Sequence, residues 1–321
     1  MQKQSFDEKL ARLHDIAGGP ISDEAVRALR DTLKGSQVVL VALAAEIVGN
    51  RRIEDLAPDL VRAFNRFMTG PDKGCQVKIA VVNALNRLEH QADDVLLRGI
   101  KHVQMEPAFG GPVDAAADLR AGCAVMLTNL RHPEAHTELT DLLVDPEVNP
   151  RRAAVKALAH LGTEGAEMAI RLKALVGDGE PDVLGECFAA LLSMSPGRSM
   201  SFVAGFLASP DPAAAEQAAL ALGQSHEAEA FEILREHWEN NLSPEFRRML
   251  LLPISLLRRD DAFQFLIGVI ESSGSNLATE AVTALGVYAD DNSRRKVHDA
   301  VKRRNDPSVS AAFACEFGVA D

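Results

Sequence analysis

The chain has 321 residues, of which 47% are hydrophobic, 25% are charged and only 5% are aromatic, and its formal net charge is −12. Sandwiches and barrels draw on aromatic and β-branched residues for their strands, whereas strong helix formers such as Ala, Leu, Glu and Arg dominate here. This composition excludes an all-β fold. The lack of any uncharged apolar run of about 18 residues argues against a membrane-spanning helix.

The amino-terminal residues are polar and amphipathic, and they lack the apolar stretch of a signal peptide. Four cysteines lie far apart in the chain, each within an apolar helical stretch: Cys75, Cys123, Cys187 and Cys315. Scattered thiols are typical of buried cysteines in a reducing compartment, not of a disulfide framework. The sequence therefore predicts a cytoplasmic protein.

Two-helix units follow one another along the chain. After capping helices in residues 1–35, apolar residues recur at helical spacing in 38–64, 78–100 and 120–143, and each stretch is long enough for a helix, a turn and a second helix. Two Gly/Pro-rich loops interrupt this part of the chain: RFMTGPDKG (66–74) and MEPAFGGPVD (105–114). The glycines and prolines of these loops are interpreted as breakers alone.

The central unit, NPRRAAVKALAHLGTEGAEMAI, shows the pattern most clearly. Its first helix is apolar around most of its circumference, and Ala157, Leu158 and Leu161 are predicted to be buried between neighbouring units. Gly162 suits the left-handed position after a helix end, and Thr163 suits the N-cap of the next helix. In that second helix we expect Ala169, Leu172, Leu175 and Val176 to face inward, and Glu167 and Arg171 to form an i,i+4 pair.

The Leu-Gly ending of this first helix recurs at Gly223 and Gly286, after 61 and 63 residues, so two units in each interval give a period of about 31. The sequence therefore predicts an all-α, right-handed αα-superhelix of about eight helical hairpins with essentially no β-sheet. We expect a single domain over 1–321, with capping helices in 1–35, repeats in 36–306 and a partial unit in 307–321.

Residues 145–178, DPEVNPRRAAVKALAHLGTEGAEMAIRLKALVGD, resemble a bacterial HEAT-like repeat. The resemblance rests on the acidic-Pro entry, the basic start of the first helix, the Ala-Leu-x-x-Leu-Gly close and the acidic turn. It implies an α-solenoid whose second helices line the concave surface. It says little about function, because repeat scaffolds host unrelated roles.

Some HEAT-like proteins are enzymes or bind nucleic acid. Deoxyhypusine hydroxylases of this type carry repeated His-Glu pairs, whereas this chain has the single pair His226-Glu227, so that activity is set aside. His132 and His136 have a zinc-like spacing, but Pro133 suits a first helical turn, no third ligand follows from the spacing, and no metal or cofactor is expected. The basic doublets all have acidic neighbours, which disfavours a DNA glycosylase. A bilin-lyase activity stays open as the alternative.

The excess negative charge is confined to the middle of the chain. Residues 111–240 carry 20 acidic and 9 basic side chains, a net charge of −11. Acids at the starts of second helices stabilise helix ends, and on a concave wall they would also attract a basic partner. We therefore expect a non-enzymatic scaffold that binds a basic protein or peptide, with its oligomeric state open, through Glu134, Glu138, Glu164, Glu167, Glu227 and Glu232.

Overall fold

The computed structural model describes residues 5–288 and 290–318, and it divides the chain into two compact units, Met1–Ala166 and Glu167–Asp321. The helices of the first unit are α1 (Phe6–Gly18), α2 (Asp23–Leu33), α3 (Val38–Asn50), α4 (Ala57–Thr69), α5 (Gln76–Arg87), α6 (Asp93–Gly99), α7 (Ala117–Asn129), α8 (Ala135–Leu142) and α9 (Val148–Leu161). This unit also holds two short antiparallel strands, β1 (Met105–Glu106) and β2 (Val113–Asp114).

Helix α10 (Glu164–Val176) runs from the end of the first unit into the second. The second unit continues with α11 (Pro181–Met194), α12 (Pro196–Gly205), α13 (Pro212–Gln224), α14 (Ala228–Asn240), α15 (Pro244–Leu256), α16 (Asp260–Ser272), α17 (Ser275–Ala284), α18 (Asp291–Arg304) and α19 (Pro307–Phe317). Short 3-10 turns occur at Glu54–Leu56, Lys73–Cys75, Phe206–Ala208 and Leu285–Val287.

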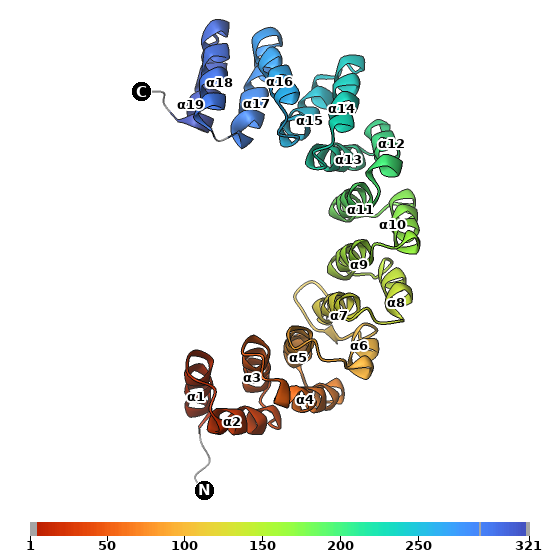
Figure 1. Cartoon of the computed structure of the whole chain (residues 1–321), viewed down its shortest axis with the longest axis vertical. Coiled ribbons are helices and arrows are strands. Elements are labelled where there is room, and N and C mark those ends of the chain that lie inside the picture. The colour runs from red at the N-terminus through yellow and green to blue at the C-terminus, as the bar shows by residue number, and fades with distance from the viewer. Residues whose placement is uncertain (1–4, 289, 319–321) are drawn as a thin grey trace. The chain divides into compact units, whose positions relative to one another are not determined.

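The helices alternate between two layers (Figure 1). Within each unit the odd-numbered helices pack on one another as one layer, and the even-numbered helices form the other layer. The pairs α3/α4 to α17/α18 are the eight predicted hairpins, with α1/α2 before them and α19 after them. The all-α repeat fold and the number of hairpins are thus confirmed.

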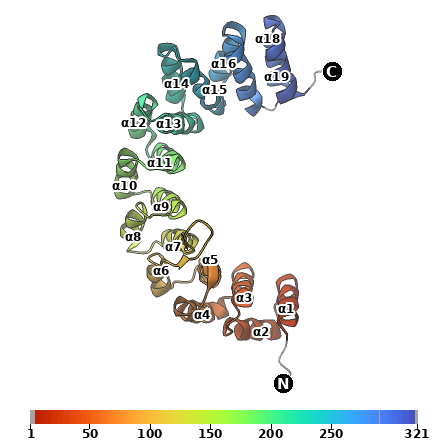
Figure 2. The same cartoon turned by 180° about the vertical axis from the view of Figure 1, so that it is seen from behind.

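The inner layer is formed by the first helices of the hairpins, not by the second helices as expected. Within each unit taken by itself, the first helices of the hairpins lie on the inner side of the arc and the second helices on the outer side (Figures 1 and 2). The expectation that second helices line a concave wall was therefore wrong. Within each unit, the first helices that are not at the ends of the inner layer are covered on both flanks, and this arrangement requires the wide apolar faces that the sequence shows.

Helix α9 illustrates why these residues form a first helix. Leu158 is fully buried and Ala157 nearly so, as predicted, while Leu161 at the end of the helix is partly exposed. Gly162 ends the helix with φ 66°, a left-handed conformation that costs glycine little. The hydroxyl of Thr163 then accepts the backbone N–H of Ala166 at 3.2 Å, which confirms it as the cap of α10.

The recurring Leu-Gly pair has two different physical causes. Gly162 has a left-handed backbone, but Gly223 lies inside α13, and the left-handed residue of that turn is His226. A Cβ atom at Gly223 would lie 2.3 Å from the carbonyl oxygen of Pro253 in α15. The glycine at 223 is therefore a close-contact residue that allows two first helices to approach each other.

The solvent-facing side of α10 corrects another expectation. Ala166, Ile170 and Ala174 are its buried apolar residues, whereas Leu172, Leu175 and Val176 are mostly exposed. Ala169 is partly exposed. Both sides of this helix are apolar in sequence, so helical periodicity alone did not identify the buried side.

Candidate protein-binding surface

A buried ion pair fixes the start of α5. The Asp72 carboxylate accepts the backbone N–H groups of Val77 at 3.0 Å and Lys78 at 3.1 Å, and it lies 3.2 Å from the Lys78 ammonium. Lys78 also donates to the carbonyl oxygen of Phe67 at 3.2 Å. Both charged side chains are buried, and each is matched by an opposite charge and by hydrogen bonds, as burial of charge requires.

A second buried cluster joins the hairpin strand β2 to α7 and to the turn before α9. The Arg120 guanidinium lies 2.6 Å from a carboxylate oxygen of Asp114, and it forms a two-pronged contact with Asp145 at 2.6 and 2.8 Å. It also donates to the carbonyl oxygen of His102 at 2.9 Å. Arginine suits this position because its planar fork can bind several oxygens at once.

The charge states of this cluster are held by its hydrogen bonds. Burial acts to lower the pKa of Arg120, but the bonds with Asp145 and Asp114 outweigh it, so that pKa is raised. Burial acts to raise the pKa of Asp114, but backbone hydrogen bonds from Gln104 and Ala116, together with Arg120, hold this pKa below its usual value. Asp114 and Arg120 are therefore both stabilised in their charged forms, and together with Asp145 they form a buried anchor.

This anchor supports the β-hairpin of residues 103–114, of which the segment 105–114 was expected to be a simple loop. The backbone N–H of Gln104 donates to Asp114 at 2.9 Å, and the Gln104 side chain donates to the carbonyl oxygen of Asp72 at 2.7 Å. Glu106 accepts the backbone N–H of Gly74 at 2.7 Å, and this bond is the main reason that its pKa is lowered. The base of the hairpin is thus bonded both to α7 and to the start of α5.

The tip of the hairpin is apolar and fully solvated. The side chain of Phe109 has 111% relative exposure, and Met105 and Val113 are more than half exposed. Gly110 and Gly111 follow with φ 99° and 131°, a region that favours glycine, and no atom would contact a Cβ at either position. In both ribbon views the hairpin projects beside α7 on the inner side of the first unit (Figures 1 and 2).

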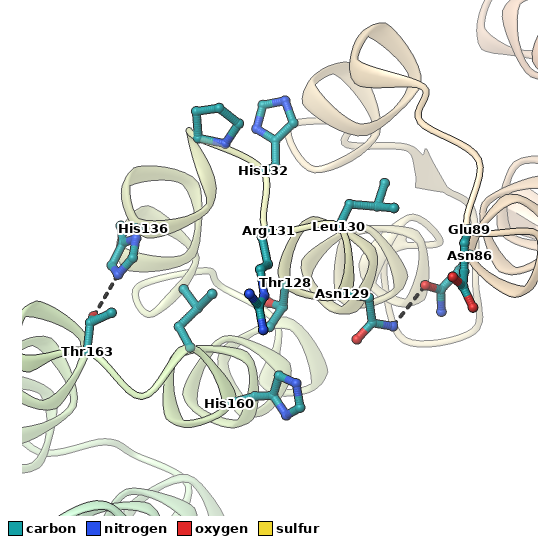
Figure 3. Close-up of a pocket in the computed structure, with 12 residues that line it drawn as sticks. Asn86, Glu89, Thr128, Asn129, Leu130, Arg131, His132, His136, His160 and Thr163 are labelled. Atoms are coloured by element: carbon teal, nitrogen blue, oxygen red, sulfur yellow. Dashed lines mark hydrogen bonds between the residues drawn. The ribbon is translucent and has the colours of Figure 1, made fainter.

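A polar groove of about 910 Å³ lies elsewhere in the first unit, where α5, α7 and α9 end. Three histidines line it, but Figure 3 shows that their rings point in different directions. His136 bonds to the Thr163 hydroxyl at 2.7 Å, and His132 accepts the backbone N–H of Glu134 at 3.1 Å. Within residues 5–288 and 290–318, no group of three or more His, Cys, Asp or Glu side chains could hold a metal ion.

The six acidic residues that were predicted to bind a partner differ in burial and in pairing. Glu138 is buried and pairs with Lys101 at 2.6 Å, and Glu167 is buried and accepts from Arg198 at 2.7 Å and from Ser195 at 2.6 Å. Glu167 therefore does not pair with Arg171, contrary to expectation. Glu232 is exposed but pairs with Arg235. The remaining three are exposed: Glu134, Glu164 and Glu227.

The thiols are mostly buried, as expected. Cys75, Cys123 and Cys187 are buried, whereas Cys315 on α19 is exposed. Burial raises the pKa of Cys75 to about 11 and the pKa of Cys187 to about 12, and it raises the pKa of Cys123 as well. A thiol is nucleophilic only as a thiolate, so these three are inert at neutral pH.

Among the helices that the structure describes, none has the length and apolar character of a membrane span.

Comparison with known proteins agrees with this geometry. The sequence model of the family described as HEAT repeats matches residues 113–191, which span α7 to α11. Residues 113–191 therefore carry HEAT repeats. No curated protein sequence matches this chain significantly.

Solved structures are similar to this chain in fold. A Kap121p mutant structure has a TM-score of 0.52 at 12% identity, covering 98% of this chain and 40% of that chain. An importin beta structure has a TM-score of 0.50 at 13% identity, covering 98% and 47%. The chain thus spans less than half the length of either.

A complex of CpcE and CpcF of phycocyanin lyase, from Nostoc sp. PCC7120, has a TM-score of 0.35 at 17% identity, covering 89% of this chain and 96% of that chain. At these identities the Kap121p and importin beta structures show the fold alone.

Proposed function

We propose that this protein is a non-enzymatic scaffold that binds a protein partner, and that the hairpin of residues 103–114 anchors the partner. One observation carries the proposal: Phe109 is fully exposed at the end of a segment whose base is held by buried ion pairs. A solvated phenyl ring contributes nothing to the stability of the fold. It supplies binding energy when a partner buries it.

The rigid base favours this role for a physical reason. Association must offset the entropy lost when mobile segments become ordered, and that cost is smaller for a segment that is already fixed. Aromatic side chains in well-packed pockets carry much of the energy of many interfaces. The tip, residues 107–112, carries no charged side chain. The partner we propose therefore presents an apolar pocket, and its contact with Phe109 has little dependence on salt.

A second proposal concerns the excess negative charge. In the first unit Glu134 and Glu164 are exposed, and they can attract a basic segment of the same partner or of another one. Charge reversal at both positions should weaken such binding and reduce its salt dependence, because exposed charges are screened within about 10 Å. Unchanged affinity and salt dependence would remove the acidic surface and leave the hairpin proposal standing. The bilin-lyase alternative rests on family resemblance alone.

Substitution at the tip tests the main proposal. A photo-crosslinking residue at position 109 should capture a stoichiometric partner from the source cell, whereas one at Val144, another highly exposed site, should not. With that partner purified, Phe109→Ala should weaken binding about 30-fold or more, as expected for an interface hot spot. Val144→Ala is the matched control. If Phe109→Ala binds as tightly as wild type, the hairpin is not the anchor.

A further inference from the structure

Helix α10 exposes a continuous apolar face. Met168, Leu172, Leu175 and Val176 are between 61% and 76% exposed, although all four are large hydrophobic residues. Their spacing of i, i+4, i+7 and i+8 places them within an arc of about 100° on one side of the helix. The opposite side supplies the buried Ile170. The helix is thus apolar on a side that nothing within its own unit covers.

The charged neighbours of this face are occupied elsewhere. The Arg171 guanidinium stacks 3.7 Å from the centre of the Phe202 ring. The Lys173 ammonium pairs with Asp178 at 2.8 Å, and both of those side chains are largely buried. Covering the face would therefore not require either cation to lose its partner. Isolated exposed apolar residues are common, but a stripe of four on one helix marks a contact surface.

We infer that α10 is a dimer contact, in which this face packs antiparallel against the same face of a second copy of the chain. A two-fold axis through Leu172 places Met168 opposite the Val176 of the second copy, and Ala169 opposite its Leu175. Apolar side chains then meet apolar side chains along the whole stripe, which is the self-complementarity that a two-fold contact requires. Antiparallel packing also places opposite ends of the helix dipoles side by side.

The size of the face sets the strength of the contact. A stable interface of standard size buries about 800 Å² on each partner, and four mostly exposed side chains supply about half of that area. The dimer is therefore weak, with a dissociation constant of about 100 µM. Phe109 is not one of the four residues of this face, so the dimer and the hairpin proposal are tested by separate substitutions.

Sedimentation equilibrium of the full chain tests the inference. The wild type should be a monomer at about 1 µM and partly a dimer at about 200 µM, while Leu172→Lys should stay monomeric at both concentrations. The residue is exposed, so the variant should keep its far-UV spectrum. Leu242→Lys, at a 78% exposed position between α14 and α15, is the matched control and should dimerise as wild type does.

Crosslinking through one exposed cysteine tests the register, in a Cys315→Ser background that removes the exposed native thiol and leaves three buried ones. Leu172→Cys should form a disulfide-linked dimer, because the two-fold axis passes through that position. Met168→Cys should not, because four residues of helix on each side of the axis separate the two thiols by about 12 Å, and a disulfide needs Cβ atoms about 4 Å apart.

A monomeric wild type at high concentration, or a dimer unaffected by Leu172→Lys, would overturn the inference. Crosslinking of Met168→Cys as fast as Leu172→Cys would overturn the antiparallel arrangement.

Discussion

The cluster around Arg120 gives the most demanding prediction, because it stands at the base of the hairpin and is almost completely buried. Replacing Arg120 with Met keeps an unbranched apolar stem but removes the guanidinium charge that lies between Asp114 and Asp145. Two buried carboxylates would then face each other without a cation. Loss of one partner from a buried ion pair costs about 3–5 kcal/mol, and we expect the free energy of unfolding to fall by that amount at pH 7.

A triple variant separates the cost of unpaired charge from the cost of lost packing. Asp114→Asn and Asp145→Asn, combined with Arg120→Met, remove all three charges and retain an acceptor oxygen for the backbone N–H groups that the aspartates bind. Because no uncompensated charge remains, the triple variant should recover about half of the stability lost by the single one. A triple variant that is less stable than Arg120→Met would contradict the electrostatic explanation.

The pH dependence follows from the lowered pKa of Asp114. In the wild type this group binds its proton less readily when folded than when unfolded, so its contribution to stability is present above the unfolded pKa and is lost as the pH falls through the folded pKa. Without Arg120, burial instead acts to raise the pKa of Asp114. The difference in stability between wild type and Arg120→Met should therefore shrink as the pH is lowered from 7 to about 4.

Urea denaturation provides the assay, with far-UV circular dichroism as the signal for both units. Trp238, the single tryptophan, lies in α14 of the second unit, so its fluorescence reports the unit that the substitution leaves unaltered. The dichroism transition should shift to lower urea more than the fluorescence transition does, as local opening in a repeat array implies. A loss below about 1 kcal/mol by dichroism would refute the assignment of Arg120 as a buried charge anchor.

Three further predictions concern packing and thiol chemistry. Leu158→Ala, in the fully buried centre of α9, should cost about 2–5 kcal/mol in urea denaturation, and wild-type stability would mean that the buried face is misassigned. Gly223→Ala should lower the free energy of unfolding by about 1–3 kcal/mol, because its Cβ would collide with the backbone of Pro253. Gly268→Ala is the matched control in α16. Its Cβ would meet nothing within 4 Å, so it should raise the free energy of unfolding by about 0.5–1 kcal/mol. A thiol reagent at pH 8 should label Cys315 alone in the native chain and four cysteines in denaturant, and rapid native labelling of a second thiol would contradict the burial of the other three.

Several features of this protein could be predicted from the sequence because their causes are local. Helix periodicity, the Thr163 cap and the left-handed turn at Gly162 depend on residues within one or two turns of each other, so the hairpin repeat and the burial of Leu158 could be predicted. The low aromatic and β-branched content likewise predicted a chain with almost no sheet.

Other features depended on neighbours that are distant in sequence. Glu138 and Glu167 looked like free surface acids in the sequence. In the structure they form ion pairs with Lys101 and Arg198, which lie 37 and 31 residues away. Gly223 looked like a helix end, but it is a contact with Pro253. The Gly/Pro-rich segment 105–114 looked like a breaker, but its ends pair as two strands whose base is bonded to the buried cluster around Arg120.

The orientation of α10 shows the physical reason for this division. Apolar residues occupy two sides of the helix. Their periodicity therefore predicts a helix, but it does not predict which of the two apolar sides is buried. That choice is made by the elements that pack against the helix, and in the folded chain they cover Ile170 and leave Leu172 in solvent. Local patterns determined the secondary structure, whereas packing between repeats decided which surfaces are left to bind a partner.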